Sequence, residues 1–128
     1  MSIIEYLDEV YPDPPLLPKD PEARAHARAI AFHISSNIQP LQGSLCREKL
    51  GIQWCHDVIC RGFDALEQLL KLYSGRFCVG DLITIPDLMV PSIVRRAREK
   101  YNVDMEQYPI IRRIEEELAG FPEFWNNS

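Results

Sequence analysis

No stretch of this sequence approaches the roughly 20 consecutive apolar residues that a membrane-spanning helix needs. The beginning of the chain also lacks the basic segment of a secretory signal peptide, because Glu5 and Asp8 closely follow Ile3 and Ile4. These two features argue against a membrane protein and against a secreted one. We therefore expect a cytoplasmic protein that does not interact with membranes.

Redox and metal motifs are missing as well. The chain has four cysteines, and no two of them have the C-x-x-C spacing of a redox or zinc site. His56 follows a cysteine directly, but adjacent residues of a helix point in different directions and no second ligand pair follows. We expect no metal site and four free thiols. The cysteines are Cys46, Cys55, Cys60 and Cys78.

Three further absences limit the function and the fold. The net charge of −5 argues against nucleic acid as a partner. No glycine-rich phosphate loop and no spacing typical of a nucleophile–base pair is present, so we predict no catalytic residue within these 128 residues. No run alternates between apolar and polar residues, as a half-buried strand does. The sequence therefore predicts an all-α fold that is one domain or part of one.

The clearest helix signal that is present begins at Thr84, whose hydroxyl is suited to an N-cap. Asp87 follows three residues later, where its carboxylate can reach back to the N-cap amide in a capping box. Asp87 is also the one charged residue between Leu82 and Val94, so we expect this helix to be central and buried on nearly all sides. A structural capping role for Asp87 is favoured over the alternative, a catalytic acid.

The pattern along the chain predicts three regions. Residues 1–10 form a helix with an apolar face that includes Ile3 and Leu7. Residues 11–19 contain several prolines and form a stiff linker. Residues 20–128 form the helical domain. Since the apolar face of the first helix must cover something, we expect that helix to belong to a larger fold.

A basic cluster follows the central helix signal and admits two interpretations. The cations can complement the dipole at the C-terminal end of a helix. Alternatively, one of them can face a cleft and bind a substrate carboxylate. The cluster consists of Arg95, Arg96, Arg98 and Lys100.

The bend between residues 38 and 45 also admits two interpretations. Pro40 interrupts the backbone hydrogen-bonding pattern and Gly43 makes the chain less rigid, so this stretch can be a simple kink. Alternatively, the polar groups freed at the bend, including the Gln39 side chain and the backbone of Gly43 and Ser44, can contact a ligand.

Several motifs resemble the glutathione transferase superfamily. The signature G-D-x-[IV]-[ST]-x-x-D of its helical domain is matched between Gly80 and Asp87. Three other stretches resemble the zeta class of that superfamily, the maleylacetoacetate isomerases. They are residues 3–18, the motif I-Q-P-L-Q at residues 38–42, and Val103-Asp104 with Tyr108-Pro109.

The resemblance implies a glutathione transferase C-terminal-like helical bundle over residues 20–128, with residues 1–10 as the last helix of a thioredoxin-like domain. It also implies a homodimer that uses glutathione as a cofactor to isomerise maleylacetoacetate to fumarylacetoacetate in tyrosine and phenylalanine breakdown. The serine-cysteine motif that activates the thiol in the family has no counterpart here, so we expect these 128 residues alone to be inactive.

The resemblance also assigns binding residues. Gln39 matches the glutamine that approaches glutathione, and Gly43, Ser44 and Leu45 match the short segment that completes that site. The family usually has asparagine where this chain has Gly43, so one side-chain amide is lost.

For the substrate carboxylate, the arginine of the family aligns with Arg98 when residues are counted from Pro91. Counted back from Val103, it aligns with Lys100 instead. We favour Arg98, because a planar guanidinium can bind a carboxylate with two parallel hydrogen bonds. The alternative function is a non-catalytic helical module for binding or dimerisation.

Overall fold

The chain folds into helices joined by short turns, and the computed structural model describes residues 1–124. The last four residues of the expected 20–128 domain lie outside the described residues. The prediction of an all-α fold is confirmed, because the β-type contact in the described part of the chain is an isolated bridge between Ser74 and Gly80. In chain order the α-helices and 3-10 helices (η) are α1 (Ser2–Val10), α2 (Pro21–Asn37), η1 (Gln39–Gln42), α3 (Ser44–Leu50), α4 (Ile52–Tyr73), α5 (Ile85–Tyr101), η2 (Met105–Gln107), α6 (Pro109–Leu118) and η3 (Pro122–Phe124).

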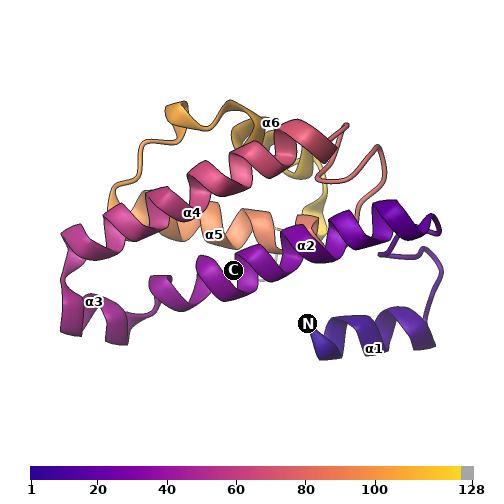
Figure 1. Ribbon diagram of the computed structural model, residues 1–128, viewed down its shortest axis with the longest axis horizontal. Helices are drawn as coiled ribbons and strands as arrows, with labels where there is room; N and C mark the ends of the chain where they lie inside the picture. Colours follow the sequence, from indigo (N-terminus) through magenta and orange to yellow (C-terminus); the bar gives the residue numbers. More distant parts are fainter. Residues whose placement is uncertain (125–128) are drawn as a thin grey trace.

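Helix α5 lies at the centre of the bundle and packs against α2, α4 and α6 (Figure 1). Its side chains are buried on nearly all sides from the first turn onward, as the sparse charge in this stretch predicts. A helix that is apolar around most of its circumference is stable in water only when other helices surround it. The buried residues are Ile85, Pro86, Asp87, Met89, Val90, Pro91, Ile93, Val94, Ala97 and Tyr101.

The first turn of α5 contains a capping box formed by Thr84 and Asp87. One carboxylate oxygen of Asp87 accepts hydrogen bonds from the Thr84 backbone N–H at 2.8 Å and from the Thr84 hydroxyl at 3.1 Å. The other accepts the backbone N–H of Cys78 at 2.9 Å. Burial raises the pKa of the Asp87 carboxyl, and the hydrogen bonds from Thr84 and Cys78 oppose that rise. One carboxylate thus joins the start of α5 to the preceding loop.

A second buried carboxylate joins α4 to α6. The Glu67 side chain is only 5% exposed and accepts the backbone N–H groups of Ile110 at 2.7 Å and Ile111 at 3.0 Å. These N–H groups belong to the first turn of α6, where a helix has no intrahelical acceptors. Glu67 therefore supplies the cap of α6 from the neighbouring helix.

Helix α1 lies to one side of the bundle, beneath α2 in Figure 1. Two polar contacts tie it to the rest: Glu5 pairs with Arg28 of α2 at 3.0 Å, and Asp8 accepts the backbone N–H of Leu16 at 2.6 Å. Ile4 of its apolar face is half-buried and packs against the core, whereas Ile3 is 73% and Leu7 47% exposed. The described part of the chain thus covers only part of the face that the sequence pattern predicts to be buried.

Replacing Asp87 with alanine is expected to lower the free energy of unfolding by about 3 kcal/mol, because two buried backbone N–H groups lose their acceptor. Chemical denaturation followed by circular dichroism measures the change. The matched control is Asp81→Ala, which removes an exposed carboxylate that accepts the Arg76 backbone N–H at 3.0 Å. Its expected cost is less than about 1 kcal/mol. Equal losses of the free energy of unfolding in the two variants would contradict the central role of the Asp87 cap.

Candidate functional site

The segment from Gln39 to Leu45 crosses from the end of α2 to the start of α3 and is held against α5. Gln42 is 5% exposed, and its side-chain amide donates to the backbone carbonyl of Ile93 at 2.9 Å. The Tyr101 hydroxyl donates to the Gly43 carbonyl at 3.5 Å, near the upper limit for a hydrogen bond. Two positions of α5 therefore fix this segment, so that its exposed groups have a defined place.

The residues predicted to bind a ligand lie on the solvent side of this segment. Gln39 is exposed, and its side-chain amide forms no hydrogen bond with the residues that the structure describes. Ser44 and Leu45 are also exposed. They belong to helix α3, so the predicted bend ends at Gly43 and does not continue through Leu45. Gly43 is half-buried, so Gln39, Ser44 and Leu45 are the exposed members of this stretch.

Gly43 is not a glycine that the backbone requires. Its φ of −77° and ψ of 152° are extended values that any residue adopts. A Cβ atom at this position would lie 3.6 Å from the Pro40 carbonyl oxygen, an ordinary contact. The backbone and its surroundings therefore accept a Cβ atom at residue 43.

A close approach between two helical elements sets the position of the segment. The backbone of α4 at Gly62 faces Ile38, which immediately precedes Gln39. A Cβ atom at residue 62 would lie 2.8 Å from the Cγ1 atom of Ile38 and 3.4 Å from the Asn37 carbonyl oxygen. His33 of α2 also contacts this place, with its Nε2 atom 2.8 Å from the Gly62 carbonyl oxygen. The absence of a side chain at Gly62 allows α4 to approach the end of α2.

Arg98 lies on α5, and its guanidinium faces α6. It donates two hydrogen bonds to the Glu115 carboxylate, at 3.2 and 3.0 Å, and its own side chain is 50% exposed. The hydrogen bonds to Glu115 raise the pKa of Arg98. No hydrogen bond in the described residues joins Arg98 to residues 39–45. Lys100 is exposed and forms no ion pair with the residues that the structure describes.

Sequence reasoning missed Gln42, the one buried glutamine of the segment. Its position in the motif I-Q-P-L-Q beside Gln39 was visible, but its partner on α5 lies 51 residues away in the chain. Within residues 1–124, no group of three or more His, Cys, Asp or Glu side chains could hold a metal ion. Every helix within the same residues is too short or too polar to span a lipid bilayer.

Comparisons with curated proteins place these features in a family, although no protein-family model matches the chain. A probable maleylacetoacetate isomerase of Caenorhabditis elegans is 46% identical over 131 residues, which cover 97% of this chain and 61% of the relative. Maleylacetoacetate isomerase of Mus musculus is 40% identical, with 97% of this chain and 59% of the relative covered. The chain thus spans about 60% of the length of these relatives.

Solved structures agree with the sequence relatives. A maleylacetoacetate isomerase from Anaeromyxobacter dehalogenans, solved with bound glutathione (GSH) in the active site, matches with a TM-score of 0.90 and 37% identity over 97% of this chain and 60% of that chain. A glutathione S-transferase from Legionella pneumophila matches with a TM-score of 0.89 and 31% identity over 97% of this chain and 71% of that chain. The chain belongs to the glutathione transferase family, within the zeta class that contains the maleylacetoacetate isomerases.

Proposed function

We propose that the complete protein isomerises maleylacetoacetate to fumarylacetoacetate with glutathione as its cofactor, in the cytoplasm and in the breakdown of tyrosine and phenylalanine. The observation that carries the proposal is the fixed segment with the exposed amide of Gln39, which has no partner among residues 1–124. This amide belongs to the motif by which the chain resembles the zeta class. Bound glutathione would supply the thiol that adds reversibly to the cis double bond of the substrate.

The described residues fit glutathione as part of its site. Gln39 offers an amide that can both donate and accept, and Ser44 offers a hydroxyl in the same segment. The backbone of Gly43 and Leu45 completes the segment. Because Gln42 and Tyr101 fix this segment on α5, little ordering is needed when a ligand binds. These residues bind and orient the cofactor, and we propose no residue within residues 1–124 that activates its thiol.

The regions expected from the sequence give the proposed architecture. Residues 1–10 would be the last helix of a thioredoxin-like domain, residues 11–19 the linker, and residues 20–128 the helical domain. The exposed Ile3 and Leu7 of α1 support this arrangement, since such a domain would cover them. We propose that the complete protein is a homodimer and that the 128 residues alone have no isomerase activity.

Arg98 is the proposed ligand of the substrate carboxylate. A guanidinium has five N–H donors, and Glu115 accepts two hydrogen bonds from Arg98, so three donors remain available. The Glu115 pairing also holds the guanidinium in one place. Lys100 is the alternative, because its ammonium has no partner in the described part of the chain. It lies two residues after Arg98 and therefore points to a different side of α5.

Replacing Gln39 with alanine in the complete protein is expected to raise the KM for glutathione about three- to tenfold, the effect of one lost hydrogen bond. The isomerisation assay at varied glutathione concentration measures it. Gln68→Ala is the matched control, because Gln68 is also an exposed glutamine of a helix. An unchanged KM in Gln39→Ala would contradict the binding role. A complete protein without isomerase activity would contradict the function and favour the non-catalytic module.

Replacing Gly43 with asparagine is expected to lower the KM for glutathione a few-fold, because the new amide can add a hydrogen bond at a position where a Cβ atom makes only an ordinary contact. The free energy of unfolding should change by less than about 0.5 kcal/mol. Gly43→Ala is the control that adds the Cβ atom without the amide. The same KM for the two variants would contradict a missing ligand contact at residue 43.

Replacing Arg98 with glutamine is expected to raise the KM for the dicarboxylate substrate tenfold or more and to leave the KM for glutathione unchanged, because a charge-assisted contact to substrate alone is lost. Glu115→Gln separates this role from stability. It removes the charge of the partner and keeps the guanidinium, so the substrate KM should stay within about twofold of the original. If the substrate KM rises in Lys100→Gln and does not rise in Arg98→Gln, Lys100 binds the substrate carboxylate.

A further inference from the structure

A cysteine and a histidine meet on the side of α4 that faces α5 and α6. The Sγ atom of Cys60 lies 3.6 Å from the Nε2 atom of His56, one helical turn earlier. On its other side, the His56 ring contacts the end of α5, where its Nδ1 atom lies 2.7 Å from the Tyr101 carbonyl oxygen. A nucleophile, a base and a group that orients the base therefore lie in one row.

The contact with Tyr101 determines the tautomer of the neutral ring. A carbonyl oxygen only accepts hydrogen bonds, so the Nδ1 atom of His56 must carry the proton. The Nε2 atom then has its lone pair available, and the Cys60 thiol donates to it. The backbone of α5 thus prepares His56 to accept a proton from Cys60.

The surroundings keep the Cys60 thiol protonated. Burial raises the pKa of Cys60, the charges of Asp57 and Asp64 raise it further, and the Tyr108 hydroxyl beside the thiol lowers it. The same hydroxyl donates to the Cys60 carbonyl at 3.3 Å. Because a protonated thiol is a weak nucleophile, any reaction of Cys60 needs a base nearby.

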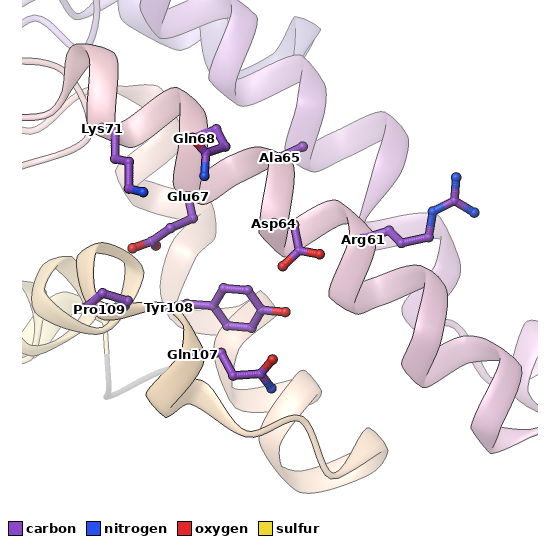
Figure 2. Close-up of a pocket in the computed structure, with 9 residues that line it drawn as sticks. All are labelled: Arg61, Asp64, Ala65, Glu67, Gln68, Lys71, Gln107, Tyr108 and Pro109. Atoms are coloured by element: carbon purple, nitrogen blue, oxygen red, sulfur yellow. The ribbon is translucent and has the colours of Figure 1, made fainter.

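A groove of about 650 Å³ adjoins this cluster between α4 and the start of α6. Figure 2 shows the Tyr108 ring between Asp64 of α4 and Gln107, with the Arg61 side chain pointing away from them. Two groups that line the groove, Asp64 and Tyr108, also act on the pKa of Cys60. Cys60 itself does not line the groove, and its side chain is half-buried. The carboxylates of Asp57 and Asp64 disfavour negative charge at the thiol, so an anionic reagent is at a disadvantage there.

We propose that Cys60 is a covalent modification site for uncharged, electron-poor alkenes, and that His56 accepts the thiol proton as the bond forms. The sulfur electron pair forms the S–C bond to one alkene carbon, and the π electrons move to the other carbon, beside the activating carbonyl. The proton passes from Sγ to Nε2 of His56 and then to that second carbon. No oxidant or reductant is needed, and the reaction does not depend on the proposed isomerase function.

The test is the rate at which N-ethylmaleimide labels Cys60 and Cys46 in the complete protein, measured by mass spectrometry of the peptides that contain them. Cys46 is the internal control, because its half-buried thiol donates to the Pro40 carbonyl at 3.4 Å and has no imidazole beside it. We expect faster labelling of Cys60 than of Cys46. His56→Gln should slow the labelling of Cys60 at least tenfold, since a positioned base contributes about a hundredfold or more to a rate. The labelling rate of Cys46 should stay unchanged.

A second variant tests the charge preference without altering the base. Asp64 is exposed, so Asp64→Asn is expected to keep the fold. The anionic reagent 3-maleimidopropanoic acid should label Cys60 more slowly than N-ethylmaleimide does, and Asp64→Asn should narrow that difference. An unchanged Cys60 rate in His56→Gln, or Cys60 labelling no faster than that of Cys46, would overturn the proposal. Equal rates for the two reagents would overturn the preference for uncharged alkenes.

Discussion

The rest of the structure depends on a buried carboxylate that joins the start of α5 to the loop before it. Asp87 accepts hydrogen bonds from Thr84 and from Cys78, and so fixes both the first turn of α5 and the loop that leads to it. Because α5 packs against α2, α4 and α6, a change in its starting point would shift three interfaces. The cost of burying this charge is offset by three hydrogen bonds to it.

The same helix connects the core to the candidate glutathione segment. Its backbone at Ile93 accepts the Gln42 amide, and its Tyr101 side chain reaches the Gly43 carbonyl. Farther along, the Tyr101 carbonyl orients the ring of His56. One rigid helix therefore positions the residues proposed to bind the cofactor and the imidazole beside Cys60, so the two sites share a scaffold without sharing side chains.

Local rules were sufficient for the fold class and for the Asp87 cap, because Thr84 and Asp87 are three residues apart and their roles follow from helix geometry. The partners of Gln42 and Glu67 could not be predicted, since they lie 51 and 43 residues away in the chain. The motif with Gln39 predicted a bend through residue 45. The start of α3 at Ser44, which ends this bend earlier, depends on tertiary packing. The contact between His56 and Cys60 could have been predicted, because residues four positions apart lie on the same face of a helix.

Because Gly62 has no side-chain carbon, the structure limits which residues can replace it. Any larger residue there must displace Ile38, the immediate neighbour of Gln39. The proposed cofactor site therefore constrains a residue in the middle of α4 that the cofactor itself would not touch.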